Sequence, residues 1–207
     1  CLEEKNSEDN FLKISLSTGT ISKENVATFD RLKTKKEGYW ALETSYPLLD
    51  IEGYVQIKDT ATYFNKDSFA SFSSVNGIMP KRISFFSLKG ASYVFNRLIG
   101  FNLKQNFFKN TLENTNILSV DKVKIKVGNI CFDTSKCDLK NDIKNLRIYD
   151  DKSVIEWNFD QIDSVYLEKS LFNKERLVFG NVSGKIRLAN QKPIEIDNFK
   201  ACLFIKS

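Results

Sequence analysis

Apolar and polar residues alternate with a period of two over short segments in the first third of the chain. In "GYWALETSY" the alternation places Trp40 and Leu42 on one face, and in "IEGYVQIK" it places Val55 and Ile57 on one face. Such alternation is typical of half-buried β-strands. Because Gly and Asn separate the segments, the pattern predicts an antiparallel meander that begins near Phe11.

The period changes after Pro80, where the apolar residues of "MPKRISFFSLKGASYVFNRLIGF" fall at helical spacing. Ser87 is suited to an N-cap and Gly100 to a left-handed C-terminal cap. The spacing therefore predicts a helix between them. "CDLKNDIKNL" predicts a second, short helix by the same spacing. The residues that carry the two patterns are Leu88, Ala91, Val94, Phe95, Leu98 and Ile99 in the first segment, and Leu139, Ile143 and Leu146 in the second.

Alternation returns in "DKVKIKVGNICF", "VIEWNF" and the segments that follow, as far as "FKACLFI". The sequence contains no internal repeat and no linker rich in Gly, Ser or Pro, so residues 11–207 are predicted to form one mainly β domain. One helical segment covers only part of a wide sheet. We therefore expect the sheet to close into a barrel, to pack on a second sheet, or to curl around a cavity plugged by the helices.

The charged residues narrow the class of function. The 31 basic and 26 acidic residues give a net charge of +5. The lysines mostly alternate with apolar residues, as in "KVKIKV", which is typical of a solvated strand face and argues against nucleic-acid binding. The chain has no His, and it lacks the GxSxG, P-loop and GxGxxG motifs. The sequence therefore predicts a protein that is not an enzyme, with no metal and no cofactor.

Two features of the cysteines suggest an extracytoplasmic protein. Cys131 and Cys137 lie six positions apart across a turn-like Asp-Thr-Ser, which allows a local disulfide; two free thiols are the alternative. Cys1 is followed by an acidic polar stretch, predicted as a flexible tether over residues 1–10. Either Cys1 is the lipidated first residue of a mature lipoprotein, or it marks an arbitrary boundary.

Several landmarks occur in the order seen in a known family. "ETSYPLLDIEGYVQI" carries Pro47 and Leu48 where that family has an Asn-Pro-Leu-Gly turn, and "FNRLIGF" carries Leu98 and Ile99 where it has a Trp-Ile-Leu-Gly-like sequence. "SVIEWNF" and "GKIRLANQKPIEIDNF" resemble two of its later strands. On these motifs the chain resembles the LolA/LolB lipoprotein-carrier superfamily, and LolB-like outer-membrane lipoprotein receptors in particular.

This resemblance implies a curved antiparallel sheet that forms an incomplete, half-open β-barrel with a helical lid. It implies a monomer, anchored through Cys1 to the periplasmic face of the bacterial outer membrane. Such a protein would receive acylated lipoproteins from a periplasmic LolA-like carrier and insert them into that membrane. The acyl-chain cavity is expected to be lined by Trp40, Leu42, Val55, Ile57, Phe86, Leu88, Phe95, Leu98, Ile155 and Trp157.

Pro47 cannot donate to a central ladder, so "YPLLD" is predicted as a turn between two strands. Leu48 and Leu49 form its apolar tip. The resemblance implies that this loop, and at least Leu48, inserts into the membrane during release of cargo. The alternative is that both side chains fold back onto the rim of the core.

Two further functions fit the same composition. One is a surface-exposed lipoprotein that binds a host or partner protein through a solid β-sandwich. The other is a lipopolysaccharide-transport jelly roll, which would lack the central helix.

Overall fold

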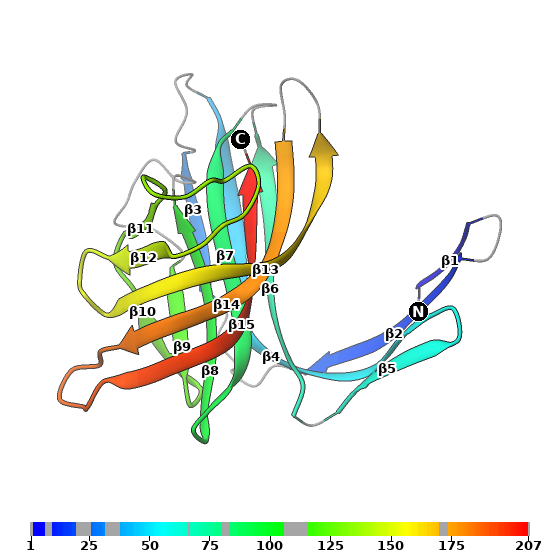
Figure 1. The fold of residues 1–207 in the computed structure, drawn as a ribbon, viewed down its shortest axis with the longest axis horizontal. Helices are drawn as coiled ribbons and strands as arrows, with labels where there is room; N and C mark the ends of the chain where they lie inside the picture. Colours follow the sequence, from blue (N-terminus) through cyan, green and yellow to red (C-terminus); the bar gives the residue numbers. More distant parts are fainter. Residues whose placement is uncertain are drawn as a thin grey trace.

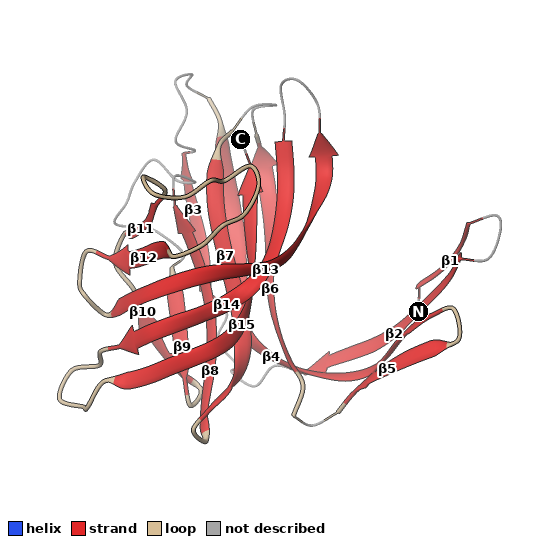
Figure 2. Ribbon diagram, in the orientation of Figure 1, coloured by secondary structure: helices blue, strands red, loops and turns tan. Residues whose placement is uncertain are grey.

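The computed structural model describes residues 2–6, 10–19, 26–31, 38–65, 67–79, 83–105, 116–169 and 174–206. Within these ranges the protein consists of strands and connecting turns, with no helix (Figure 2). A six-stranded sheet contains β1 (Leu2–Asn6), β2 (Asn10–Gly19), β3 (Val26–Arg31), β4 (Trp40–Ile57), β5 (Thr60–Phe64) and β6 (Phe69–Ile78). A nine-stranded sheet contains β7 (Phe85–Val94), β8 (Arg97–Gln105), β9 (Ile117–Val120), β10 (Val123–Lys126), β11 (Ile130–Asp133), β12 (Leu146–Asp150), β13 (Ile155–Lys169), β14 (Lys174–Ile186) and β15 (Ile194–Lys206).

The nine-stranded sheet is antiparallel and curls around its own core. Its order is β10-β9-β8-β7-β15-β14-β13-β12-β11, so β15 joins two halves that are distant in sequence. The curl brings the β11 end back to the β7–β8 region, where the rings of Phe132 and Phe86 stack at 5.4 Å. Phe101 packs against Trp157 and Phe199 in the centre, with ring centroids 4.8 Å and 5.2 Å apart. The predicted curved, incomplete antiparallel barrel is therefore present in this sheet.

The six-stranded sheet is organised around the 18-residue strand β4. The first part of β4 pairs with β3 and β6, and the second part pairs with β2 and β5. In Figure 1 the second part of β4, together with β1, β2 and β5, extends away from the rest of the molecule as an arm. The first part of β4 and β6 lie against the outer face of β7 and β8.

The segment "YPLLD" is part of β4 and not a turn. The ladder between β4 and β6 shifts register between Tyr46 and Leu49, and this bulge accommodates Pro47, which has no N–H to donate. Leu48 is 2% exposed, and Leu49 is also buried. A Cβ added at Gly100 of β8 would lie 2.4 Å from the Pro47 carbonyl oxygen, so Leu48 packs where β4 crosses closest to β8. The prediction of a membrane-inserting loop at Leu48 and Leu49 is wrong, because both leucines are buried within strand β4 and Leu48 packs at Gly100 of β8.

The predicted helical lid is a β-hairpin. Residues 85–94 and 97–105 are strands β7 and β8, joined by Phe95 and Asn96 with φ of 45° and 63°. Positive φ at both central residues is the signature of a tight type I′ hairpin turn. In β8 apolar residues are buried on both faces, because Ile99, Phe101 and Leu103 face the barrel core and Leu98 is buried on the opposite face, so the period of two is obscured there.

The second predicted helix is also absent. Residues 139–141 and Asn145 form bends, residues 142–144 between them are irregular, and β12 begins at Leu146. Ile143 is fully buried as part of the barrel core, while Leu139 packs against its margin. Because this segment crosses one end of the barrel, its apolar residues fall at helical spacing without a helix.

The N-terminal segment is partly ordered as a strand. Residues 2–6, predicted as part of a flexible tether, form β1 and pair with β2. Cys1, predicted as the lipid anchor, lies outside the described residues. In the described part of the chain, no helix has the length and apolarity that crossing a membrane requires.

Candidate ligand-binding site between the two sheets

Two adjoining cavities lie where β6 faces the outer side of the nine-stranded sheet. The wider one, about 580 Å³, is open to solvent, and the more enclosed one is about 300 Å³. We call them together the inter-sheet trough. Lys89 of β7 and Cys202 of β15 line both cavities. These volumes fall within or close to the range of ligand sites in proteins.

The walls of the trough are largely apolar. The wider cavity is bounded by side chains of β6, β7, β13, β14 and β15, which include Phe69, Ala70, Ala91, Ile162, Phe179 and Ala201. The enclosed cavity adds Phe85, Leu177 and Phe204. Ile162 and Phe179 are 59% and 45% exposed, so the outer wall presents apolar surface to solvent. The structure thus leaves an apolar hollow outside the barrel core.

The floor of the trough is polar, because alternate residues of β7 point outward. Ser87 and Lys89 share this face, while Phe86 and Leu88 point into the barrel core. The register places four neighbours beside them on the same face: Lys104 and Phe204 flank Ser87, and Asn102 and Cys202 flank Lys89.

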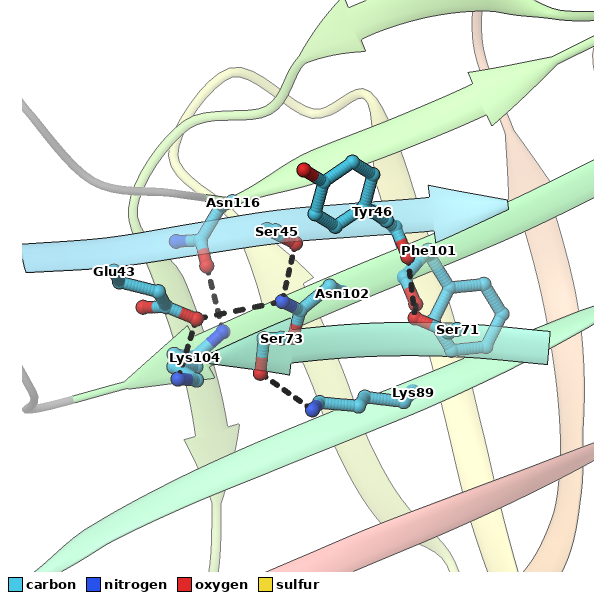
Figure 3. Close-up of polar contacts among 10 residues, drawn as sticks. All are labelled: Glu43, Ser45, Tyr46, Ser71, Ser73, Lys89, Phe101, Asn102, Lys104 and Asn116. Atoms are coloured by element: carbon cyan, nitrogen blue, oxygen red, sulfur yellow. Dashed lines mark hydrogen bonds and ion pairs between the residues drawn. The ribbon is translucent and has the colours of Figure 1, made fainter. Parts of the chain in front are cut away.

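Polar contacts join this floor to the six-stranded sheet (Figure 3). Lys89 Nζ donates to Ser73 Oγ of β6 at 2.6 Å. Lys104 Nζ pairs with Glu43 Oε1 of β4 at 2.5 Å, and both side chains are buried. Figure 3 shows Lys89 and Lys104 reaching from neighbouring strands toward β6 and β4 respectively.

Asparagine side chains complete the network. Asn102 Nδ2 donates to Ser45 Oγ at 2.6 Å. Asn116 Oδ1 accepts from the Lys104 backbone N–H at 2.6 Å, and its amide donates to the Gly128 carbonyl. These contacts hold β4 and the β9–β10 end of the barrel in fixed positions relative to β8.

Burial perturbs two ionisable groups of the trough. Desolvation, and secondarily the ammonium of Lys104, lowers the pKa of Lys89, while Glu43 acts in the opposite direction. Burial raises the pKa of the Cys202 thiol, partly opposed by Lys89. Burial therefore favours the neutral thiol of Cys202, and it places the ammonium form of Lys89 in an unfavourable medium.

One hydroxyl of the floor has no hydrogen-bond partner among the described residues. Ser87 is 3% exposed, and its Oγ is buried and unpaired. Buried polar groups are nearly always satisfied, so an unpaired one that lines a cavity indicates a place where a ligand group can bind.

The trough does not contain the residues predicted to line a cavity. Leu88, Ile155 and Trp157 are close-packed in the barrel core, Phe86 packs against it, and Leu98 is buried but lies outside that core cluster. The remaining five lie elsewhere: Trp40, Leu42, Ile57 and Phe95 are exposed, and Val55 is half-buried on the arm. The predicted cavity is wrong in position, because the concave side of the barrel is filled with side chains.

The predicted disulfide is also wrong. Cys131 and Cys137 are free thiols. Cys131 is on β11, whereas Cys137 follows the strand and donates to the Lys144 carbonyl at 3.4 Å. In the described ranges, no group of three or more His, Cys, Asp or Glu residues could hold a metal ion.

The family model for a domain of unknown function, DUF2804, matches residues 12–203. The chain belongs to the DUF2804 family. A search of curated proteins gives no match. Among solved structures, kievitone hydratase from Nectria haematococca is similar over 97% of this chain, with a TM-score of 0.51 and 10% sequence identity. The chain spans 62% of that protein. At this identity the similarity concerns the fold.

Sequence reasoning missed the residues of the trough, which are Ser73, Ser87, Lys89, Lys104 and Cys202. A signal was available in "SFFSLKGASY", where Ser87, Lys89 and Ala91 alternate with Phe86, Leu88 and Gly90. Read with a period of two, this segment predicts a strand with one small or polar face and one core face. Polar residues on a face that another sheet covers indicate a candidate ligand-binding site.

Proposed function

We propose that this DUF2804 protein is a carrier that binds the acyl chain of an amphiphile in the inter-sheet trough. The observation that supports this function is the apolar wall of Phe69, Ile162 and Phe179 around an open hollow. Burying an acyl chain there removes apolar surface from water at about 25 cal/mol per Å². A preformed hollow open on one side allows the chain to enter and leave without unfolding the barrel.

The lipid-anchored receptor predicted from the sequence is one form of this proposal. In that form the cargo is an acylated lipoprotein, Cys1 is the anchor, and a periplasmic LolA-like carrier supplies the cargo. Support comes from the curved, incomplete antiparallel barrel with an apolar hollow beside it. The hollow lies outside the barrel rather than on its concave side, so cargo would bind against β6, β14 and β15.

A titration with a fluorescent fatty-acid analogue tests acyl-chain binding. We expect saturable binding to the wild-type protein and weaker binding to Phe179→Gln, which places a polar group on the wall of the trough. Phe95→Gln is the matched control, because Phe95 is 81% exposed at the β7–β8 turn, away from the trough. Equal affinity of both variants and the wild type, or no saturable binding, would contradict the proposal. A synthetic acylated lipopeptide used as competitor tests the receptor form.

A second candidate function is acid–base catalysis of the hydratase type. Two observations favour it: the solved neighbour with this fold is a hydratase, and desolvation lowers the pKa of Lys89 in a cavity. A lysine whose pKa is lowered by desolvation gives up a proton to a bound substrate more readily than an exposed lysine does. Incubation with kievitone, read by mass spectrometry as the gain of one water, tests this candidate. Turnover that Lys89→Met abolishes would favour the enzyme over the carrier.

A further inference from the structure

The polar floor of the trough has the chemistry of a head-group site. Lys89 Nζ has three N–H donors and uses one of them for Ser73. Ser87, two residues earlier on the same face of β7, has a buried hydroxyl without a partner in the described part of the chain. The two groups line the same enclosed cavity. A ligand atom placed there meets an ammonium and a hydroxyl that are both available to donate.

The charge of the lining selects an anion. Lys89, Lys104 and Lys200 are among the described residues that line the two cavities, and no Asp or Glu is among them. The nearby carboxylate of Glu43 is bound to Lys104. An anionic group beside Lys89 would therefore relieve the cost of holding its ammonium in a desolvated position.

We infer that the trough binds single-chain amphiphiles with a carboxylate head, such as long-chain fatty acids. This inference rests on the acyl-chain binding proposed above and defines the class of ligand. The two carboxylate oxygens accept hydrogen bonds from Lys89 Nζ and Ser87 Oγ in the enclosed cavity. The chain leaves along Ala91 and Ala201 toward Ile162 and Phe179 in the wider cavity.

Head-group selectivity tests the inference on the wild-type protein. Calorimetric titrations compare laurate with dodecanol, which has the same chain and a neutral head, and with dodecyl phosphate, all below their micellar concentrations. Acetate supplies the carboxylate without the chain. We expect laurate to bind about 10- to 100-fold more tightly than dodecanol, as for a hydrogen-bonded charge. We also expect laurate to bind more tightly than dodecyl phosphate, and acetate not to compete with it.

Two variants assign the effect to the named groups. Lys89→Met is expected to weaken laurate binding by about 10- to 100-fold while leaving dodecanol binding unchanged, and Ser87→Ala by about 2- to 10-fold. Lys192→Met, in an exposed loop, is the control and should bind laurate like the wild type. If Lys89→Met fails to fold, Lys89→Gln replaces it. The comparison of head groups on the wild-type protein tests the inference even if neither variant folds.

The outcomes separate this inference from the proposed function. If none of the twelve-carbon ligands binds, the proposal of acyl-chain binding is wrong, and the inference about the head group is wrong as well. If laurate and dodecanol bind equally, the trough takes acyl chains but has no head-group site. If acetate competes as well as laurate, the site is one for small carboxylates. If dodecyl phosphate binds more tightly than laurate, the head-group class is wrong.

Discussion

Lys104 Nζ lies 2.5 Å from Glu43 Oε1, and the two buried side chains join β8 of the barrel to β4 of the second sheet. A buried ion pair contributes little net stability over an apolar pair, but removing one partner leaves an unpaired charge without solvent. Glu43→Gln should therefore lower the free energy of unfolding by about 3–5 kcal/mol. Urea denaturation measures this change.

The double variant Glu43→Gln/Lys104→Met is the control for that measurement. It removes both charges, so it should recover a large part of the lost stability. If the losses of Glu43→Gln and of Lys104→Met, measured singly, add up to the loss of the double variant, the two charges act independently.

Lys89→Met should stabilise the protein. The Met side chain keeps the apolar stem of Lys89 and removes a poorly solvated charge, which gives roughly 1–3 kcal/mol at neutral pH. The pKa of Lys89 is lowered from its ordinary value of 10.5 in the folded state. Between the lowered value and 10.5 the unfolded chain therefore binds more protons, so wild-type stability rises with pH across that window.

The Lys89→Met variant lacks the titrating group, so its stability should not show this pH-dependent increase. Denaturation at several alkaline pH values should show the stability advantage of Lys89→Met shrinking as the pH rises. An advantage that stays constant or grows would mean that Lys89 is not desolvated in the folded state.

Leu48→Glu should unfold or strongly destabilise the protein, by about 3 kcal/mol or more, because it places a carboxylate where β4 crosses Gly100. Thermal denaturation of Leu48→Glu and of Leu42→Glu makes a matched comparison on one strand, since Leu42 is 38% exposed. Wild-type stability of Leu48→Glu would support the membrane-tip prediction, which the buried position of Leu48 contradicts.

Arg176→Met should free the segment of residues 138–144 from the barrel. Arg176 is 4% exposed and donates to the Leu139 and Asn141 carbonyls at 2.8 Å and 3.0 Å, and to Gln161 and Ser164. Loss of these charge-assisted hydrogen bonds should cost about 2–4 kcal/mol. It should also speed tryptic cleavage at Lys140 and Lys144.

Arg187→Met is the control for this cleavage. Arg187 is partly exposed and pairs with Glu156 on the surface, so its loss should change stability by at most about 1 kcal/mol. Equal cleavage rates in the two variants would show that Arg176 does not hold the segment.

The strands with one exposed face were predictable from the sequence, and those with two covered faces were not. Ile155, Trp157 and Phe159 alternate along β13 on its buried face, as expected. Along β4 the alternation is present but reversed, since Trp40 and Leu42 are exposed while Ala41, Glu43 and Ser45 are buried. In β8 the outward residue Leu98 is buried as well as the core-facing residues, so the apolar positions mimic a helix. Gly90, inside the segment predicted as a helix, lies on the core face of β7, where a Cβ would meet the rings of Phe199 and Phe101 at 2.7 Å and 2.8 Å.

The site was less predictable than the fold, because its residues are distant in sequence. Lys89 and Cys202 are cross-strand neighbours only because β15 pairs with β7. Lys104 meets Glu43 only because β4 crosses β8. A local pattern states which face a side chain occupies, but it does not state which distant strand supplies the opposing group. Of the residues predicted to line a cavity, Leu88, Ile155 and Trp157 belong to the close-packed core, whereas Trp40, Leu42, Ile57 and Phe95 are exposed.

The position of β15 between β7 and β14 has a consequence for biosynthesis. During translation, β7 emerges about a hundred residues before its partner β15, so the nine-stranded sheet has high contact order and forms late. Until β15 leaves the ribosome, β7 and β14 present open edges to other nascent chains. Chains that stall before Ile194 should therefore aggregate or recruit chaperones, and the floor of the trough is assembled only in the last step of folding.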